Sequence, residues 1–452
     1  MECNPVQLSS VITSIATGPF GSNLKVSCFV DSGFPVIDGA NLKGLKLTDN
    51  LTKFVTKEKA ESLARSIAKR GDVVVTISGT LGQIAYIPED SLYPEYLCSQ
   101  RQFKVSFDQE KVYVPYLVYY FHTREGQSKI LSFANQTGVP ALAQPTKNFQ
   151  KIEVGLPTLE EQKRIVKVAE LLTAKMELNQ QINGYLERCC QSLFDDIQND
   201  RTNEMIQLSD VAAVNPKRRL TKGSLARCVE MANLSTSGSF PNDWCRKAYS
   251  GGMKFMNGDT ILARITPCLE NGKTAYINFL DEGEVAFGST EYIVLASKGL
   301  LPAEFFYFLA RNRAFVSYAT NHMNGSSGRQ RVSAQDIEAY RLRMPSSSQA
   351  ARFADFAWPI MEEILTRSLE NRRLSSLRGA LLPKLLSGEI DVSKVEIPTP
   401  PNSHLAVSSH HLPDHFTRFS TAAARQESNH RRRRSHISGF RYCPKLNGKL
   451  AA

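Results

Sequence analysis

A short stretch of the chain, PCLENGKT at 267–274, ends in the Gly-Lys-Thr of a phosphate-binding loop. Such a loop has another glycine five residues before Gly272, where the backbone must approach the phosphate. Pro267 stands at that position, and proline has neither the backbone N–H nor the freedom in φ. The stretch is therefore predicted to be a turn between two strands and not a nucleotide site.

Other residues that could do chemistry do not form a catalytic set. The chain has no HExxH, no GxSxG and no GxGxxG after a strand. VNPKRRL at 214–220 is the nearest approach to the Asn-Pro-Pro-aromatic motif of a base methyltransferase, and it lacks the second proline and the aromatic residue. His122 and His322 have no acidic or cysteine neighbours, which favours a packing or loop role. We expect no catalytic residue and no metal site in this chain.

The composition limits which classes of protein the chain can belong to. The 452 residues are 42% hydrophobic and 22% charged, which is typical of a globular protein of about three domain lengths. No apolar run approaches the roughly 18 residues of a membrane span, and MECNPVQLSS has no signal-peptide pattern. The nine cysteines include no CxxC pair, which favours a reducing compartment. We expect a cytoplasmic protein without a membrane partner.

The net charge of +11 is unevenly distributed. Residues 396–452 carry a net charge of +6, six of the eight histidines and several prolines. This composition predicts a disordered basic tail. Its RRRR at 431–434 could bind phosphate or anionic lipid, although a solvated tail is the simpler interpretation. The first 395 residues are nearly balanced, so a DNA surface there would depend on local arrangement.

The strongest pattern is a junction that occurs twice. IEVGLPTLEEQKRIV (152–166) alternates like a strand, stops at a proline and continues as a helix that begins with Thr158 and Glu161. YRLRMPSSSQAARF (340–353) repeats this order with Ser346 and Gln349, 188 residues later. In each pair the hydroxyl and the longer side chain can satisfy each other's backbone N–H groups, which makes a capping box.

The repeat extends beyond the junction. Segment 71–87 matches 258–277 as strand, glycine turn and strand, and 114–121 matches 301–310 as an aromatic helix with a proline near its start. Segment 135–154 matches 323–342 as a loop rich in Gly and small polar residues that leads into the last strand. A period this long indicates two duplicated domains and not a solenoid.

A long helix is predicted after each junction. The first, Thr158 to about Gln198, would be roughly 60 Å long. Positions spaced by three and four predict an apolar seam, interrupted by Lys175 and Asn179: Ile165, Val168, Leu172, Ile182, Leu186 and Leu193. The second seam is less regular: Phe353, Phe356, Ile360, Ile364, Leu374, Leu377 and Leu381. Pro359 predicts a start or kink there, and Gly388 a stop. The two stripes would be buried against each other or against partner helices.

The duplicated segments resemble a known family. LPTLEEQKRIVKVAELL and ARFADFAWPIMEEILTRSLENRRLSSLRGALLPKLLSGEI are similar to the two helical regions of a specificity (S, HsdS) subunit of a type I restriction–modification enzyme. FGSNLK (20–25), SGFPVIDGANL (32–42) and GDVVVTISGTLGQIAYI (71–87) are similar to its target-recognition domain. The resemblance covers about residues 1–395, and the tail after Val392 has no counterpart.

The resemblance implies a mixed α/β fold. Two target-recognition domains in pseudo-twofold repeat would be separated by two long antiparallel helices that form a coiled coil. The implied parts are a first recognition domain at 1–156, a helical spacer at 157–200, a second recognition domain at 201–344, a second spacer at 345–395 and the tail at 396–452.

The resemblance also implies partners. Each recognition domain would read one half of a bipartite, asymmetric target in double-stranded DNA. The helices would dock two modification (M) subunits that carry S-adenosylmethionine, and these would bring restriction (R) subunits with ATP and Mg. No cofactor is expected in this chain, which would be a non-catalytic recognition subunit.

Within such domains, loops that combine small residues with hydrogen-bond donors are the expected DNA contacts. In the first domain these are Ser22, Asn23, Lys25, Ser78, Thr80, Arg101, Gln102, Gln136, Thr137 and Lys147. In the second they are Lys217, Arg218, Arg219, Arg264, Asn324, Ser326, Arg329, Gln330 and Arg331. The cluster GRQR (328–331) is the strongest candidate, because arginine can bind guanine and glutamine can bind adenine.

Three other functions remain open. The chain could be a stand-alone DNA-binding regulator, which would bind DNA tightly by itself. It could be a silent specificity allele that recombines with a neighbour. It could also be a scaffold whose domains bind protein or RNA, and strong salt dependence of duplex binding would argue against that.

Overall fold

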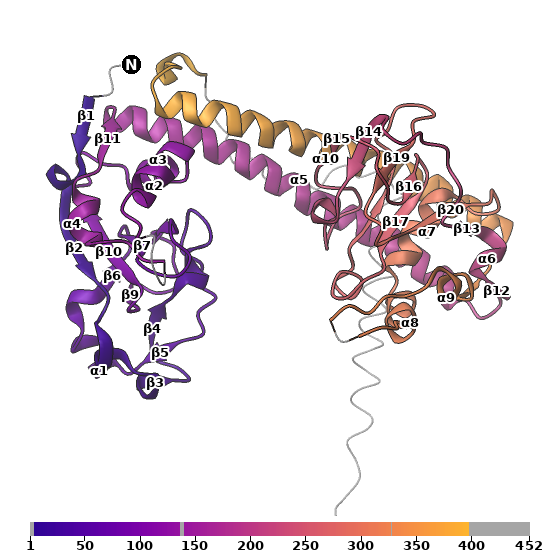
Figure 1. Ribbon diagram of the computed structural model, residues 1–452, viewed down its shortest axis with the longest axis horizontal. Helices are drawn as coiled ribbons and strands as arrows, with labels where there is room; N and C mark the ends of the chain where they lie inside the picture. Colours follow the sequence, from indigo (N-terminus) through magenta and orange to yellow (C-terminus); the bar gives the residue numbers. More distant parts are fainter. Residues whose placement is uncertain (1–3, 136–139, 327, 397–452) are drawn as a thin grey trace, which may run out of the picture. The chain divides into compact units, whose positions relative to one another are not determined.

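The structure of the chain is a computed structural model that describes residues 4–135, 140–326 and 328–396. Residues 397–452 of the predicted disordered tail, and Gln136 and Thr137 among the candidate contacts, lie outside the described residues. The described chain consists of two sheet-containing domains and two long helices that pack together (Figure 1). The expected mixed α/β fold is therefore confirmed.

The first domain is built on a four-stranded antiparallel sheet of strand order β2-β10-β7-β8. A five-stranded sheet, β3-β5-β4-β9-β6, and the pair β1-β11 complete it. The strands are β1 (Asn4–Gln7), β2 (Ile12–Thr17), β3 (Phe29–Val30), β4 (Phe34–Ile37), β5 (Phe54–Val55), β6 (Ile67–Lys69), β7 (Val73–Thr76), β8 (Ile84–Tyr86), β9 (Glu95–Cys98), β10 (Gln102–Phe107) and β11 (Glu153–Leu156).

The second domain repeats this topology. Its antiparallel sheet has the order β13-β20-β17-β18, and a second sheet, β15-β14-β19-β16, and the pair β12-β21 accompany it. The strands are β12 (Met205–Gln207), β13 (Ala212–Val214), β14 (Leu225–Val229), β15 (Cys245–Ala248), β16 (Lys254–Phe255), β17 (Thr260–Ala263), β18 (Thr274–Tyr276), β19 (Ala286–Gly288), β20 (Tyr292–Ser297) and β21 (Arg341–Arg343).

The predicted hairpins are confirmed in both halves. β7 pairs with β8 from Val73 opposite Tyr86, and β17 pairs with β18 from Thr260 opposite Tyr276. The Gly-Lys-Thr that resembled a phosphate loop leads into β18, so it belongs to a hairpin. Each half also has one parallel pair, β4 with β9 and β14 with β19. Apart from β3, which has no counterpart in the second domain, the pairing agrees between the two domains, so they are copies of one fold.

One apolar helix in each domain joins the sheet to the long helices. α2 (Val114–Phe121) packs on β8 and on the first long helix, and α7 (Ala303–Arg311) packs on β17, β18, β20 and both long helices. The remaining short helices are α1 (Lys57–Glu61), α3 (Arg124–Leu131), α4 (Pro145–Gln150), α6 (Leu208–Val211), α8 (Arg313–Asn321) and α9 (Ala334–Glu338). The 3-10 turns are η1 (Leu8–Ser10), η2 (Gly21–Leu24), η3 (Val26–Cys28), η4 (Gly39–Leu42), η5 (Ala64–Ser66), η6 (Met231–Asn233) and η7 (Val392–Lys394).

Both predicted capping boxes are present. The Glu161 N–H donates to Thr158 Oγ1 at 3.3 Å and the Thr158 N–H donates to Glu161 Oε2 at 2.9 Å. At the second junction the corresponding distances are 3.3 Å from the Gln349 N–H to Ser346 Oγ and 2.8 Å from the Ser346 N–H to Gln349 Oε1. The boxes begin α5 (Leu159–Asn199) and α10 (Ser347–Leu386).

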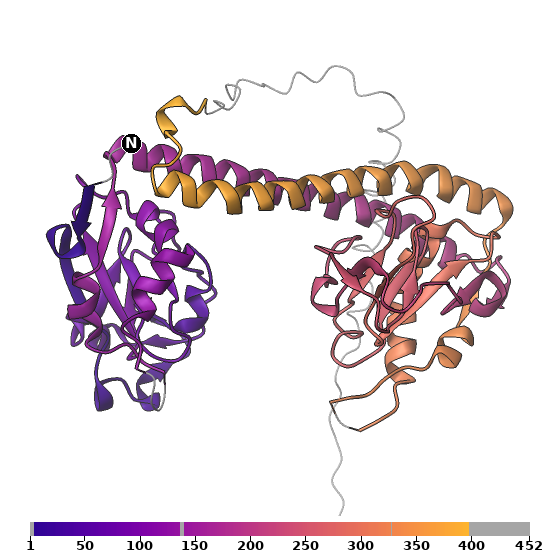
Figure 2. The ribbon, with the colours of Figure 1, turned by 45° about the horizontal axis from the view of Figure 1, so that its top comes forward.

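The two long helices lie side by side in both ribbon views (Figures 1 and 2). Their contacts run in opposite order along the two helices: Arg378 Nη1 donates to Thr173 Oγ1 at 3.2 Å, and the rings of Phe194 and Phe353 lie 6.4 Å apart. The pair is therefore antiparallel.

Pro359 lies inside α10, so the expectation of a helix start at this residue is wrong. Phe353, Ala357 and Met361 around it are buried, and this packing offsets the hydrogen bond that proline removes. The predicted stop is confirmed, because α10 ends at Leu386 and Gly388 has a φ of 78°.

The buried stripe of each long helix differs from the predicted seam. Ile165, Phe353 and Ile364 are buried as expected. Phe356 and Leu377, however, are 41% and 45% exposed and take no part in the buried interface. The positions half-buried at the predicted seam are Val168, Leu172, Ile182, Leu186, Leu193, Ile360, Leu374 and Leu381. The fully buried positions of α5 also include Val166, Ala169, Cys190, Phe194 and Ile197.

The stripe is displaced because each helix end packs against a domain as well as against the other helix. Ile165 and Val166 of α5 join Leu385 of α10 in the core of the first domain. Phe194 of α5 and Phe353 of α10 do the same in the second, where the Phe194 ring lies 4.7 Å from that of Phe305. Each domain core therefore includes parts of both long helices.

Candidate nucleic-acid interface

Three segments meet where β7 ends in the first domain. The Ile77 N–H donates to the Arg101 carbonyl at 2.6 Å, and the Leu142 N–H donates to the Ile77 carbonyl at 2.9 Å. The Gly79 N–H reaches the Pro140 carbonyl at 3.2 Å. This junction joins the turn after β7, the residue before β10 and the end of the polar loop, and it brings together loops that are far apart in the sequence.

The second domain has the same junction where β17 ends. The Arg264 N–H donates to the Glu291 carbonyl at 3.0 Å, and the Val332 N–H donates to the Arg264 carbonyl at 3.0 Å. The Thr266 N–H reaches the Gln330 carbonyl at 3.0 Å. Arg264 therefore corresponds to Ile77 and Glu291 corresponds to Arg101, because they hold the same places in the same backbone network.

Several of the candidates in the first domain gather at this junction. Ser78 bridges to Ala141, and Thr80 and Arg101 are exposed beside it. Gln100 ties in the turn that carries Ser22, Asn23 and Lys25, since its Nε2 donates to the carbonyls of Gly21 at 2.9 Å and Leu24 at 2.8 Å. Those three side chains are exposed. Gln100 is thus a supporting residue that the sequence did not single out.

Two other candidates of the first domain lie differently. Lys147 is exposed on α4, which follows the polar loop. Gln102 is only 1% exposed, and its Oε1 accepts a hydrogen bond from Ser99. A side chain buried in this way has no edge to present to a base, so Gln102 supports the loop and is removed from the candidate contacts.

In the second domain Arg264, Asn324, Gln330 and Arg331 meet at the junction. Ser326 and Arg329 are exposed in the adjacent loop. The guanidinium of Arg331 binds Glu291, with Nε 2.9 Å from each carboxylate oxygen and Nη2 2.7 Å from Oε1. The Arg331 hydrogen bonds lower the pKa of the Glu291 carboxyl, so the pair is ionised at neutral pH.

The basic run 217–219 separates into two kinds of residue. Lys217 and Arg219 are exposed. Arg218 instead binds the buried Asp259, with Nε at 3.0 Å and Nη2 at 2.5 Å from its oxygens. Asp259 is 2% exposed and burial raises the pKa of its carboxyl. Arg218 is therefore held by a structural ion pair and is not available as a DNA contact.

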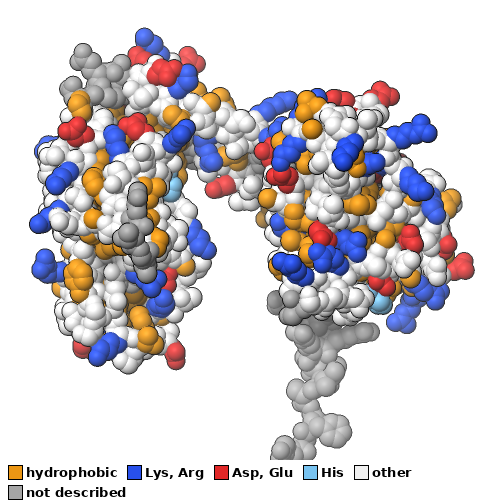
Figure 3. All heavy atoms as spheres, viewed as in Figure 1, with side chains coloured by type: hydrophobic (Ala, Val, Ile, Leu, Met, Phe, Trp, Pro, Cys, Tyr) orange, Lys and Arg blue, Asp and Glu red, His pale blue; other side chains and the backbone are white. Residues whose placement is uncertain are grey.

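On the face shown in Figure 3, basic side chains on both domains are interspersed with acidic ones. This face therefore does not present one large basic surface that would steer DNA. Local arrangement at the two junctions is the feature that could recognise a polar ligand, as the nearly balanced charge of the first 395 residues had suggested.

Near its centre the interface of the long helices is polar and symmetric. Asn183 Nδ2 donates to the Ile364 carbonyl at 3.3 Å, and Asn371 Nδ2 donates to the Met176 carbonyl at 3.0 Å. Both asparagines and both carbonyl residues are 188 residues apart, so the two bonds are related by the pseudo-twofold repeat. Asn179 adds a bond to Asn371 Oδ1 at 2.9 Å. Polar residues at such a contact fix the register of paired helices.

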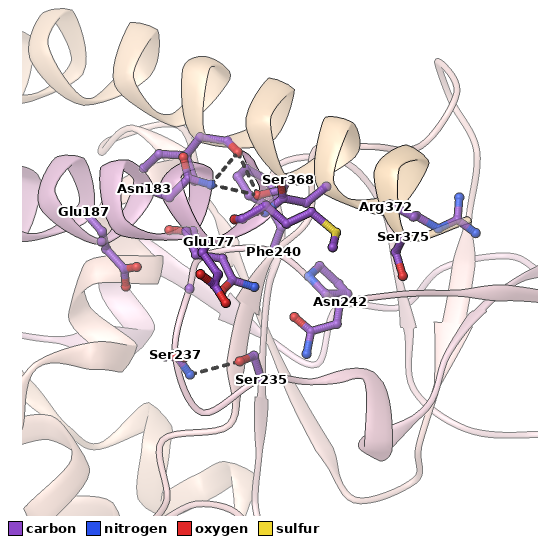
Figure 4. A pocket seen from close by; sticks show the side chains of 18 of the residues that line it. Glu177, Asn183, Glu187, Ser235, Ser237, Phe240, Asn242, Ser368, Arg372 and Ser375 are labelled. Atoms are coloured by element: carbon purple, nitrogen blue, oxygen red, sulfur yellow. Dashed lines mark hydrogen bonds between the residues drawn. The ribbon is translucent and has the colours of Figure 1, made fainter. Parts of the chain in front are cut away.

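A pocket of about 1000 Å³ opens beside this polar contact, between the long helices and the segment 235–243 (Figure 4). Figure 4 shows Asn183 bonded to Ser368, at 3.3 Å, at its rim. Its charged residues are largely paired: Arg372 with Asp243 at 2.7 Å, and Glu187 with Arg311 at 3.5 Å. The first pair holds the second domain against α10, and the second pair holds it against α5.

Apolar side chains are exposed on the long helices. Leu178 and Tyr185 on α5 are 51% and 64% exposed, and Trp358 on α10 is 51% exposed. Together with Phe356 and Leu377 they form an apolar set that neither domain covers. Exposed large apolar residues are typical of protein–protein contacts.

Among residues 4–135, 140–326 and 328–396, no group of three or more metal-ligating side chains is found. Within the same residues no helix is long and apolar enough to span a membrane. His122 contacts the Ile84 carbonyl through Nε2 at 2.8 Å.

Comparison with known proteins shows what this chain is similar to. Residues 14–188 match the family model of the type I restriction modification DNA specificity domain. The chain is 30% identical over 180 residues to the EcoEI specificity subunit of Escherichia coli, covering 38% of this chain and 30% of that protein. It is 20% identical over 372 residues to the MjaIX specificity subunit of Methanocaldococcus jannaschii, covering 75% and 82%.

One solved structure shares the fold. The type I S subunit of M. genitalium superposes with a TM-score of 0.53 at 13% identity, over 85% of this chain and 96% of that chain. Two copies of one sheet domain, each joined to a long helix of an antiparallel pair, are the fold that the chain shares with that S subunit. The resemblance to specificity subunits of type I restriction–modification enzymes is thereby confirmed.

Proposed function

We propose that this chain is the DNA-recognition subunit of a type I restriction–modification complex. Each sheet domain reads one half of a bipartite, asymmetric target in double-stranded DNA. The observation that carries the proposal is the duplicated junction, which presents different side chains on one shared backbone network. A repeated scaffold with different contact residues is suited to two unlike half-targets, because a few side chains decide base readout.

The long helices have two roles in this proposal. They set the number of unread base pairs between the half-targets, since half-site spacing follows protein geometry. They also dock two modification subunits through the exposed set Leu178, Tyr185, Phe356, Trp358 and Leu377. The pseudo-twofold relation of α5 and α10 supports two docking sites of one kind, although the exposed residues of the two helices are not identical.

The chain itself performs no catalysis in this proposal. The modification subunits supply S-adenosylmethionine and transfer its methyl group to adenine, and restriction subunits bound through them supply ATP and Mg. The described residues contribute base recognition and spacing. Reduced binding by the chain alone is expected, because a single recognition module contacts a small DNA area.

Comparison of adenine methylation in the host genome with the gene intact and deleted tests the proposal. Loss of one bipartite motif upon deletion is expected, and it would reveal both half-targets and their spacing. An unchanged methylation pattern would contradict the proposal and leave a stand-alone regulator or a silent allele. Co-purification with a modification subunit would separate these two, because a silent allele would still bind that partner and a stand-alone regulator would not.

A further inference from the structure

Arg331 uses only some of its N–H groups in hydrogen bonds to the described residues. An arginine has five N–H groups, one on Nε and two on each terminal nitrogen. Nε and Nη2 donate to Glu291, and Nη1 donates to the Arg329 carbonyl at 3.0 Å. One N–H on Nη1 and one on Nη2 therefore have no partner among the described residues.

Because Nε and Nη2 bind Glu291 along one side of the guanidinium, the remaining N–H on Nη2 points to the outer end of the planar fork, beside Nη1. The side chain is 39% exposed, so the outer end is reachable by a ligand. Two parallel donors at this spacing match the O6 and N7 acceptors that guanine presents in the major groove.

The surroundings fix the fork in place. Arg331 exchanges two backbone hydrogen bonds with Asn324, each of 2.9 Å. The Glu291 backbone is held by Arg264 at its carbonyl and by Ser289 Oγ, 3.0 Å from its N–H. Both partners of the ion pair thus stand on fixed backbone, and a side chain fixed before binding loses less entropy when it binds.

We propose that Glu291, with the Arg329 carbonyl, positions Arg331 to read a guanine in the half-target of the second domain. Glu291 is the positioning residue and Arg331 makes the base contact. The inference rests on the proposed function and adds to it the identity of one base and the residue that makes its recognition possible.

The first domain differs at the same points. Arg101 stands where Glu291 stands, and Ile77 stands where Arg264 stands. Arg101 is exposed and has no acidic partner among the described residues. The sign of the charge is therefore reversed between Arg101 and Glu291, and the neutral Ile77 stands in place of the cationic Arg264. The two domains are expected to read different bases there.

The test is the adenine-methylation motif of the host carrying Glu291→Gln at the natural locus. A neutral amide keeps one acceptor oxygen but loses the negative charge and the second oxygen, so it holds Nε and Nη2 less strongly than a carboxylate does. Discrimination for guanine at one position of one half-target is expected to fall roughly tenfold or more, while the other half-target is unchanged. The unchanged half-target shows that the variant folds and assembles.

Glu284→Gln is the matched control, because Glu284 also binds an arginine of the same domain, Arg227, away from the junction. It should leave the motif as in the wild type. Arg331→Lys is a second variant, since lysine keeps the charge but loses the two parallel donors. It should relax the same base position as Glu291→Gln.

Three outcomes would overturn the inference. An unchanged motif in Glu291→Gln means that Arg331 does not read a guanine through this pair. Equal weakening of both half-targets means that Glu291 acts only on stability. Absence of any bipartite motif in the wild-type host removes the proposed function and the inference with it, whereas the first two outcomes leave the proposed function intact.

Discussion

The two asparagines of the polar helix contact should differ in energy although the repeat relates them. Asn371 uses both ends of its amide, since Nδ2 donates to Met176 at 3.0 Å and Oδ1 accepts from Asn179 at 2.9 Å. The Nδ2 of Asn183 makes two bonds of 3.3 Å, and its Oδ1 is buried without a partner in the described chain. The perturbation is the substitution of each asparagine by leucine.

The magnitude follows from these contacts. Asn371→Leu removes two short hydrogen bonds, each worth about 0.5–1.5 kcal/mol, and should lower the free energy of unfolding by about 2 kcal/mol. Asn183→Leu removes two long bonds but also a buried unpaired oxygen, which itself costs about 1–3 kcal/mol, so the free energy of unfolding should change by less than about 1 kcal/mol.

Urea denaturation of the purified full chain, followed by circular dichroism, measures both variants. Gln180→Leu, at an exposed position of α5, is the control for adding a leucine to the helix. Equal destabilisation by Asn183→Leu and Asn371→Leu would refute the reasoning, because it would mean that the unpaired oxygen of Asn183 carries no cost.

Further predictions concern the ion pairs and the surfaces. Arg218→Ala should lower the free energy of unfolding by about 3–5 kcal/mol, since it leaves the buried Asp259 unpaired; a loss below 0.5 kcal/mol in urea denaturation would contradict the structural role of Arg218. Trp358→Glu should reduce co-purification with a modification subunit roughly tenfold or more, while Arg352→Glu on the same helix should not; equal retention by both would exclude this surface. Arg101→Gln should change only the half-target that Glu291→Gln leaves intact, and a change in both halves of the methylation motif would argue against independent reading.

The residues that form the candidate interface could be predicted only in part. Loop composition correctly pointed to segments that meet at the two junctions, because turns with small residues and donors lie at the ends of the paired strands. It could not separate Arg331, whose side chain is 39% exposed beside Glu291, from Arg218, whose side chain is 16% exposed beside the buried Asp259. Both are arginines in polar segments, and the acidic partner of each lies about 40 residues away.

Glu291 shows how a signal can be present in the sequence and still be missed. It occupies the place of Arg101 in the repeat, before the central strand of its sheet. A search for DNA contacts favours basic and amide side chains, and a carboxylate is passed over because it repels phosphate. Its role becomes visible only when the carboxylate is seen beside Arg331.

By itself the sequence determined the duplication, because the same residue pattern is written twice in the chain. It also determined the two capped helices and the hairpins, because these depend on contacts between residues close in the chain. Thr158 with Glu161 and Ser346 with Gln349 act over three residues, and strand alternation acts over two. The tertiary structure decided which face of each long helix is buried. A helix with apolar residues on more than one face buries those that its several neighbours cover. Here the neighbours are two domain cores and the other helix, and none of them lies nearby in the sequence.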